Sequence, residues 1–376
     1  MKSESCQTDT DRRDGVPVHL PILSEKPLPV GALGVSAGPL IDGLARRIRY
    51  VRISLTDRCN YRCTYCMPDE GIELAPRADV LSFEELEATV RALQTVGVER
   101  VRLTGGEPTV RKDLIELVTR LGRLGLQDLA LSTNGERLAE LALPLRRAGL
   151  HRLNVSVDTL KPDRFAQVTR RGNLANVLAG LDAARAAGFA YTKLNCVAMR
   201  GFNDDELGAL CRYAWDRDMI PRFIELMPMA EGQLFYPGTF LSVAEQRKIL
   251  TAELGPLLSD APDAESALPG VGPARYALVR YAGSLRKVGL ISAVSEPFCD
   301  TCNRVRLSAT GQLHACLAYD DAIDLRRVLR SGLVGDALLD RLVQAARGGL
   351  SEKRASHVFS ESGCGGPRKH MVSIGG

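Results

Sequence analysis

Six repeats of a strand followed by a helix constrain the fold of this chain more than any other feature of its sequence. Short apolar runs with strand periodicity alternate with longer runs that place apolar residues at helical spacing. This alternation predicts a parallel sheet with right-handed crossovers. A closed barrel needs eight such units, so we expect an α/β fold that is either an incomplete (β/α)6 TIM-like barrel or an open doubly wound sheet. The predicted strands cover residues 48–55, 101–103, 129–131, 153–157, 191–197 and 222–226.

The predicted helices begin and end at recognisable signals. Ser82 and Glu85 form a capping box at the start of the first helix, and Gly97 ends it. Later helices are expected over residues 113–125, 135–148, 173–187 and 203–217.

Length and composition indicate a soluble chain with several parts. We expect a flexible extension over 1–38, the strand–helix repeats over 39–230, a C-terminal α+β region over 231–360 that closes the open side of the barrel, and a glycine-rich tail over 361–376. Four prolines predict a mobile surface loop over 255–274. Apolar residues make up 45% of the chain, without a run near the roughly 18 residues of a membrane span. The net charge of +4 is too weak to indicate nucleic-acid binding but permits an anionic substrate.

Unusual residues follow the predicted strands, at the edge where parallel α/β folds bind ligands. Three cysteines follow the first strand, Gly-Gly-Glu-Pro at 105–108 follows the second, and Ser-Thr-Asn-Gly at 132–135 follows the third. Ser156 and Asp158 end the fourth strand, and Met227 follows the sixth. We therefore expect the active site at this edge.

Six of the ten cysteines fall into two groups of three, and the first comprises Cys59, Cys63 and Cys66. Grouped cysteines without a signal peptide indicate metal ligands in a reduced compartment, so we expect a cytoplasmic protein. A structural zinc site needs a fourth ligand, whereas a 4Fe–4S cluster on three thiolates leaves one iron open to a small molecule. A zinc loop that borrows a distant ligand is the alternative.

The second group lies in the C-terminal region and comprises Cys299, Cys302 and Cys316. Predicted strands at 304–308 and 312–317 form a hairpin that returns the third cysteine toward the second. His314 could complete a zinc site with three cysteines and one histidine. Arg304 and Arg306 share one strand face and favour a phosphate-bearing ligand beside the metal instead.

The first cysteine loop, with Tyr65 before its last cysteine, resembles the signature of the radical S-adenosylmethionine (SAM) superfamily. The stretch 105–108 resembles the superfamily motif that binds the amino group of SAM. The resemblance implies a six-unit partial barrel and a 4Fe–4S cluster whose open iron is chelated by SAM. It also implies cleavage of SAM to methionine and 5′-deoxyadenosine through a 5′-deoxyadenosyl radical.

The two cysteine groups and the terminal Gly375-Gly376 together resemble the GTP cyclase family of molybdenum cofactor biosynthesis, over about residues 45–376. The resemblance implies a lyase that converts GTP to (8S)-3′,8-cyclo-7,8-dihydroguanosine 5′-triphosphate. It implies a second 4Fe–4S cluster, on Cys299, Cys302 and Cys316, that holds the guanine base.

Carried over position by position, this resemblance assigns the site residues. The first cluster falls on Cys59, Cys63 and Cys66. SAM contacts fall on Tyr65, Gly106, Ser156 and Met227. GTP contacts fall on Arg52, Arg102, Ser132, Lys193, Arg304, Val305 and Arg306. The tail residues Gly375 and Gly376 reach into the active site in the family.

The resemblance further implies a homodimer, a reducing electron donor and transfer of the product to a cyclic pyranopterin monophosphate synthase, without a nucleic-acid or membrane partner. Two alternatives remain. A radical SAM peptide-modifying enzyme with an auxiliary cluster typically carries more C-terminal cysteines than this chain. An iron–sulfur redox sensor without enzymatic activity leaves the Gly-Gly-Glu-Pro stretch and the six repeats unexplained.

Overall fold

The computed structural model describes residues 38–229, 237–261, 272–351, 353–357, 359 and 367–374. Nearly all of the predicted N-terminal extension and the tail residues Gly375 and Gly376 lie outside the described residues. None of the described helices is both long and apolar enough to cross a lipid bilayer.

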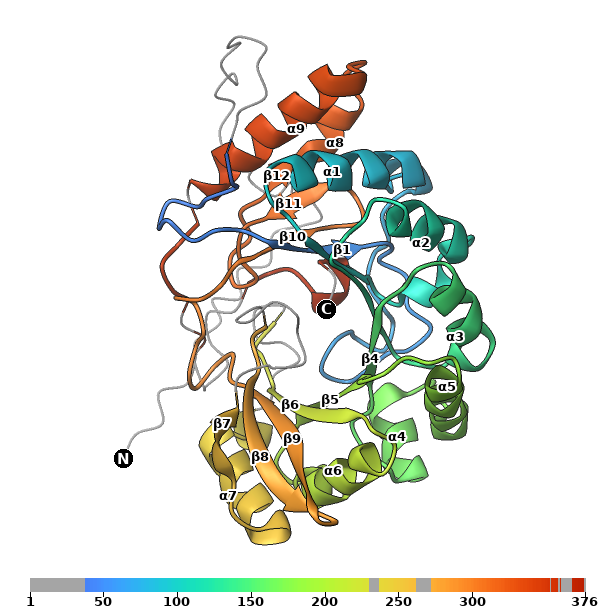
Figure 1. The fold of residues 1–376 in the computed structure, drawn as a ribbon, viewed down its shortest axis with the longest axis vertical. Helices are drawn as coiled ribbons and strands as arrows, with labels where there is room; N and C mark the ends of the chain where they lie inside the picture. Colours follow the sequence, from blue (N-terminus) through green and yellow to red (C-terminus); the bar gives the residue numbers. More distant parts are fainter. Residues whose placement is uncertain are drawn as a thin grey trace, which may run out of the picture.

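A parallel sheet of six strands in sequential order forms the centre of the molecule (Figure 1). The strands are β1 (Tyr50–Ser54), β2 (Arg100–Thr104), β3 (Asp128–Thr133), β4 (Arg152–Ser156), β5 (Lys193–Ala198) and β6 (Ile220–Glu225). Each pairs in parallel with the next. The sheet curves without closing on itself among the described residues, which confirms the predicted incomplete barrel.

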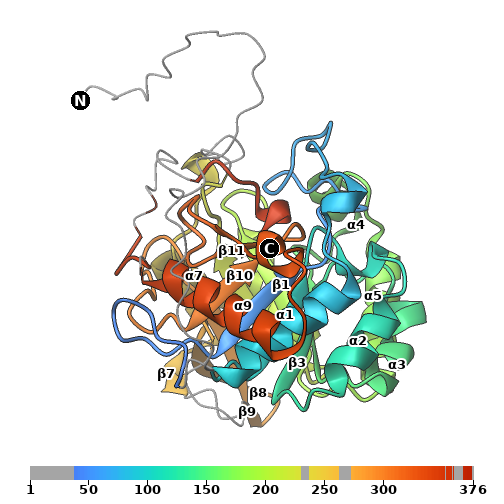
Figure 2. The same cartoon turned by 90° about the horizontal axis from the view of Figure 1, so that it is seen from above.

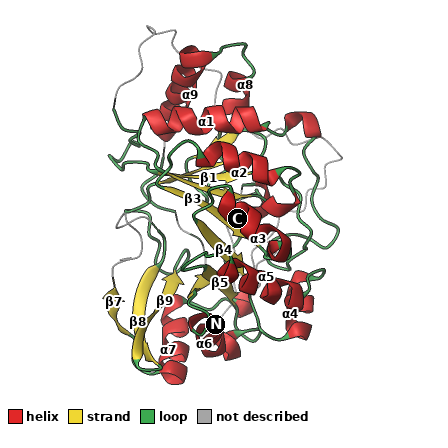
Figure 3. Cartoon of the chain, turned by 45° about the vertical axis from the view of Figure 1, so that its right-hand side comes forward, coloured by secondary structure: helices red, strands yellow, loops and turns green. Residues whose placement is uncertain are grey.

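Helices cover the outer side of this curved sheet (Figure 3). They are α1 (Phe83–Thr95), α2 (Leu114–Gly122), α3 (Leu138–Arg147), α4 (Pro162–Thr169), α5 (Leu174–Ala186) and α6 (Leu207–Trp215). The capping box of Ser82 and Glu85 is formed at the start of α1, as predicted. Helix α4 is absent from the sequence-based prediction, because its eight residues are too few for a clear period; Pro162 at its first position fits a helix start.

The C-terminal region extends the sheet at both of its edges (Figure 1). Beside β6 lie β9 (Ser284–Ile291), β8 (Arg275–Tyr281) and β7 (Leu258–Ala261), next to α7 (Val243–Leu254). Beside β1 lie β10 (Arg304–Leu307), β11 (Gln312–His314) and β12 (Ile323–Asp324). The predicted hairpin is confirmed, because β10 and β11 pair antiparallel.

Two further helices follow the second cysteine group, α8 (Leu325–Leu329) and α9 (Gly335–Leu350). Helix α9 packs against α1 (Figure 2). Helices from the first and last thirds of the described chain therefore pack side by side.

One sequence prediction for the C-terminal region is wrong. Residues 258–261, inside the predicted loop 255–274, form the edge strand β7 and pair with β8, with Leu258 opposite Leu278. The proline-rich composition of the segment gave no indication of this four-residue strand, which pairs with β8. Residues 262–271 lie outside the described residues.

The two faces of the parallel strands differ sharply in polarity. Arg52 and Arg102 point to the concave side, whereas their neighbours along each strand point to the helices. The helix-facing side chains form the main core and include Val51, Ile53, Val101, Leu103 and Leu129. Each such fully buried side chain contributes about 1.5–3 kcal/mol of transfer free energy. The main core therefore lies between the sheet and the outer helices.

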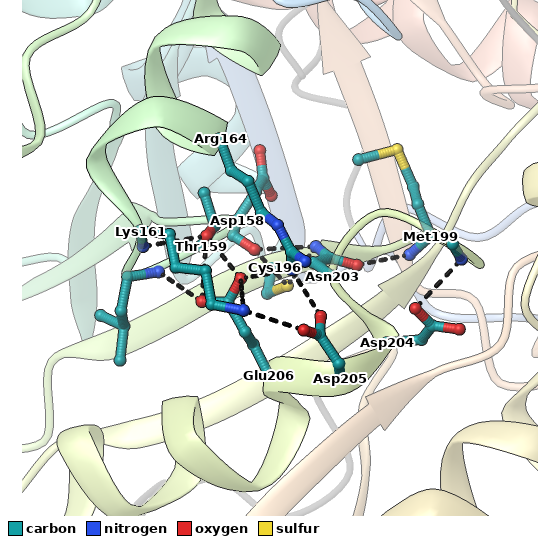
Figure 4. Close-up of polar contacts among 12 residues, drawn as sticks. Asp158, Thr159, Lys161, Arg164, Cys196, Met199, Asn203, Asp204, Asp205 and Glu206 are labelled. Carbon is teal, nitrogen blue, oxygen red and sulfur yellow. Dashed lines mark hydrogen bonds and ion pairs between the residues drawn. The ribbon is translucent and has the colours of Figure 1, made fainter.

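Hydrogen bonds from buried polar side chains connect the loop after β4 with the segment between β5 and α6 (Figure 4). The Asn203 amide donates to the backbone carbonyl of Asp158 at 2.7 Å and to that of Val197 at 2.9 Å. The buried Glu206 carboxylate accepts a hydrogen bond from the Thr159 hydroxyl at 2.8 Å. These bonds join the loop after β4 to the start of α6 and hold Asp158 in place.

Candidate active site

A cavity of about 340 Å³ lies on the concave side of the sheet. The six grouped cysteines all line it, although the two groups are separated by more than 230 residues of sequence. Among the assigned SAM and GTP contacts, only Val305 does not line the cavity. Its side chain faces the core between Arg304 and Arg306, which both point inward.

Helix α4 holds the first cysteine loop. The Arg62 N–H donates to the carbonyl of Thr169 at 3.0 Å, and the Thr64 N–H donates to the carbonyl of Val168 at 2.9 Å. Both carbonyls belong to the last turn of α4, whose C-terminal carbonyl groups need partners outside the helix. The helix that the sequence did not predict therefore positions the cysteines.

The Gly-Gly-Glu-Pro stretch packs directly against the start of the same loop. Its Gly106 N–H donates to the Thr56 carbonyl at 2.6 Å, and its Glu107 N–H donates to the Arg58 carbonyl at 2.8 Å. A Cβ atom at Gly105 would lie 2.7 Å from the Thr56 carbonyl oxygen, and one at Gly106 would collide with that of Arg58. The glycine pair is thus required by the close approach of two backbone segments.

The Glu107 carboxylate joins the loops after β2 and β3. It is buried and accepts hydrogen bonds from Thr109, from the Thr133 hydroxyl at 2.7 Å and from the Asn134 N–H at 2.7 Å. Burial raises the pKa of Glu107, while these donors oppose that shift. The carboxylate therefore holds these two strand-end loops together.

Tyr65 is fixed by the network that holds Asp158. Its hydroxyl donates to the Asp158 carboxylate at 2.7 Å, and the Val197 N–H donates to the same carboxylate at 2.8 Å. Burial raises the pKa of Asp158 to about 6, against the effect of these two donors. Sequence analysis placed Asp158 at a strand end but did not connect it with Tyr65.

Two rows of cationic side chains cross three strands on the cavity side. Arg52 on β1 lies opposite Arg306 on β10 and Arg102 on β2, and all three line the cavity. One step earlier, Tyr50 on β1 lies between Arg304 and Arg100 in the same manner. Like charges on opposed positions destabilise a sheet unless an anion neutralises them.

The pKa shifts of Arg52 and Arg306 reflect this repulsion between neighbouring arginines. Burial lowers the pKa of Arg52 well below its ordinary value, and the neighbouring Arg306 lowers it further. Burial also lowers the pKa of Arg306 to about 10, with Arg304 adding to the effect. The Nε atoms of Arg52 and Arg102 are buried without a hydrogen-bond partner among the described residues. The rows are therefore arranged for a ligand with several negative charges.

Further polar side chains continue this surface across β4 to β6. Lys193, only 8% exposed, begins β5 and lies 5.9 Å from the ring centre of Tyr276. Arg222 on β6 donates to the side-chain oxygens of Asn154 and Asn195, at 2.9 and 2.7 Å from its Nη2 atom. Sequence analysis assigned Lys193 but missed Arg222, whose inward place in the alternating 222–226 strand was the available signal.

The second cysteine group lies in a more positive environment than the first. Burial raises the pKa of Cys302, but Arg304 and Lys353 outweigh it and lower that pKa to about 7. In the first group, burial raises the pKa of Cys59 to about 11 and that of Cys66 to about 12. The two sites therefore stabilise thiolates to different degrees.

The histidine beside the second group is His357 and not His314. The Nδ1 atom of His357 lies 3.1 Å from the sulfur of Cys299. By contrast, the Nδ1 atom of His314 lies 3.1 Å from the carbonyl oxygen of Asp321, and its side chain does not line the cavity. The zinc site with His314 is therefore not formed. Among the described residues, no three His, Cys, Asp or Glu side chains surround a position for a single metal ion.

Comparisons with known proteins agree with this geometry. The profile of the Radical SAM superfamily matches residues 53–214, and that of Molybdenum Cofactor Synthesis C matches residues 219–359. The chain is 45% identical over 338 residues to a GTP 3′,8-cyclase of Heliobacterium modesticaldum, covering 90% of this chain and 100% of that protein. It is 46% identical over 336 residues to a GTP 3′,8-cyclase of Pelotomaculum thermopropionicum, covering 89% and 99%.

The chain belongs to the GTP 3′,8-cyclase family of radical SAM proteins. This membership supports the cyclase interpretation and not the peptide-modifying or redox-sensor alternatives. The superfamily uses a 4Fe–4S cluster and SAM, and the C-terminal match fits a second cluster.

In this family member, the described end of the chain returns to the cavity. Met371 and Val372, in the short helical turn Met371–Ser373, line the cavity, and Val372 lies against Gly106. Figure 1 shows this C-terminal segment inside the curve of the sheet. These residues thus line the same cavity as the first cysteine loop and the cationic rows.

The contrast between the thiols predicts different alkylation rates in the metal-free protein. Iodoacetamide reacts with the thiolate, so Cys302 should react faster than Cys59 and Cys66, with a rate that is half-maximal near pH 7 and level above about pH 8. Cys59 and Cys66 are comparably half-buried, yet their rates should still rise beyond pH 9. Mass spectrometry of labelled peptides measures the rates. Equal reactivity of Cys59 and Cys302 at pH 7 would contradict this account.

Proposed function

We propose that this chain converts GTP to (8S)-3′,8-cyclo-7,8-dihydroguanosine 5′-triphosphate, an early step of molybdenum cofactor biosynthesis. The observation that carries the proposal is the cationic row Arg306–Arg52–Arg102, placed in one cavity with both cysteine groups. A triphosphate carries about four negative charges, which would neutralise the positive charges of the three arginines in this row.

The residues at one end of the cavity fit a SAM-bound cluster. One short loop supplies the thiols of Cys59, Cys63 and Cys66, and Gly105 and Gly106 keep the neighbouring backbone close to that loop. Tyr65, Ser156 and Met227 line the same cavity and are proposed to contact SAM. When bound, the cluster would supply the electron for reductive cleavage of SAM to methionine, and a hydrogen atom from the substrate would complete 5′-deoxyadenosine.

The residues at the other end fit the substrate and the second cluster. Cys299, Cys302 and Cys316 are proposed to hold that cluster, with the guanine base beside it. Arg52, Arg102, Arg304 and Arg306 are proposed to bind the phosphates, with Ser132 and Lys193 facing the rest of the nucleotide. By fixing the nucleotide at several points, these side chains orient the ribose C3′ hydrogen toward the SAM site and exclude water.

The family also suggests how this protein works with others. We propose that it acts in the cytoplasm as a homodimer, receives electrons from a reducing donor, and passes its product to a cyclic pyranopterin monophosphate synthase.

Anaerobic turnover tests the proposed function directly. The reconstituted, reduced chain is incubated with SAM and with GTP, ATP or CTP separately, and products are separated by chromatography. The proposal predicts 5′-deoxyadenosine and a cyclised nucleotide with GTP alone. Cleavage of SAM without any change to GTP, or absence of SAM cleavage altogether, would refute it.

Substitution of Arg52 by methionine should weaken GTP binding without destabilising the fold. Loss of a charged hydrogen bond costs about 1.5–3 kcal/mol, so GTP affinity should fall about 10–100-fold. Because the substitution also relieves repulsion from Arg102 and Arg306, the ligand-free protein should melt at a higher temperature. Calorimetric titration and thermal unfolding measure both effects.

R91M, on the exposed face of α1, is the control and should change neither the affinity nor the melting temperature. Wild-type GTP affinity in R52M would argue against the role assigned to Arg52.

Removal of Gly375 and Gly376 tests the proposed tail. Met371 and Val372 line the cavity, and Gly375 follows three residues later in the sequence. The truncated protein should lose GTP turnover while keeping the iron and sulfide content of both clusters. Normal cyclase activity after truncation would show that the tail has no part in the reaction.

A further inference from the structure

A buried lysine lies directly against the second cysteine group. Lys353 follows α9 and is only 5% exposed. Its Nζ atom donates to the carbonyl of Arg304 at 2.9 Å and to that of Cys302 at 3.3 Å, and lies 3.6 Å from the sulfur of Cys302. Burying an ammonium group is costly unless it has a defined electrostatic partner. The sulfur, once it carries negative charge, is that partner.

A histidine four residues later contacts a second cysteine of the same group. His357 is 7% exposed, and its Nδ1 atom lies 3.1 Å from the sulfur of Cys299. Its Nε2 atom lies 3.2 Å from the carbonyl oxygen of Ala293, which can only accept a hydrogen bond. A cysteine that binds iron has lost its proton, so its sulfur accepts from Nδ1. Both ring nitrogens then act as donors.

The first cysteine group has different neighbours. The charged groups that act on its thiols are the carboxylates of Asp158 and Glu107, which disfavour negative charge on sulfur, and Arg62, which favours it at Cys59. The sulfur of Cys59 accepts from the Tyr61 backbone N–H at 3.4 Å. Hydrogen bonds and positive charge at cluster sulfurs stabilise the more negative, reduced cluster. The two sites therefore favour different reduction potentials.

We propose that Lys353 and His357 are positioning residues for the second cluster: by donating hydrogen bonds to two of its cysteine ligands, they fix those ligands and raise the cluster's reduction potential. The inference rests on the proposed function, because it requires a 4Fe–4S cluster at the second group. A higher potential makes the second cluster a weaker reductant, so it holds the nucleotide while reduction of SAM stays with the first cluster.

The test is an anaerobic redox titration of the full chain with both clusters, in which dithionite adds one electron to each cluster and electron paramagnetic resonance follows them. The same titration in a C59A/C63A/C66A background assigns the second signal. Lys353→Met removes the donor and the charge, and His357→Ala removes the ring. Each should lower the equilibrium constant for reduction of the second cluster at least about tenfold, which is about 59 mV for one electron. The first cluster should not change.

Matched variants separate this effect from a general loss of structure. Arg354→Met removes an exposed charge at the adjacent position, where Arg354 pairs with Asp321, and should leave both potentials unchanged. Lys353→Arg keeps the charge and should keep the wild-type potential. If Lys353→Met loses the second cluster, retention of that cluster in Lys353→Arg at the wild-type potential supports the inference, and loss in both overturns it.

Two results overturn the inference alone: full iron content and GTP turnover with unchanged second-cluster potentials in Lys353→Met and His357→Ala, or an equal shift in Arg354→Met. A wild-type chain that takes up iron only at the first group overturns both this inference and the proposed function. The iron content of the wild-type protein therefore distinguishes the two failures.

Discussion

The parallel pairing of β10 with β1 is the interaction on which the rest of the site depends. It joins a strand from the C-terminal region to the first strand of the incomplete barrel, across about 250 residues of sequence. The pairing sets Arg306 opposite Arg52 and places the second cysteine group in the cavity that the first group lines. Without it, the incomplete barrel would hold one cysteine group and only two of the three arginines in the row Arg306–Arg52–Arg102.

This arrangement has an energetic cost that an anionic ligand would offset. Three arginines on adjacent strands repel one another, and burial removes the water that would screen them. The apolar core between the strands and the outer helices stabilises the fold in spite of that repulsion. Stability and binding are thus located on opposite faces of the same strands, which lets the concave face carry charges that a core could not.

The sequence predicted the six parallel strands because each alternates with a helix, and it placed the cysteines and Gly105-Gly106 at the strand ends for the same reason. It could not predict that β10 pairs with β1, since pairing between distant strands leaves no local pattern. Arg100 was missed because the predicted second strand begins one residue after it, and His314 was considered instead of His357 because the contact of His357 with Cys299 spans 58 residues of sequence. Helix α4 and strand β7 were missed because both are short and take their order from tertiary contacts.

The measurement that tests the central claim most directly is an anaerobic structure of the reconstituted chain with GTP. The account predicts phosphate oxygens within hydrogen-bond distance of the guanidinium groups of Arg52, Arg102 and Arg306, with the guanine base at the second cysteine group. Phosphates bound away from this row, or a base turned toward the first cysteine group, would contradict it.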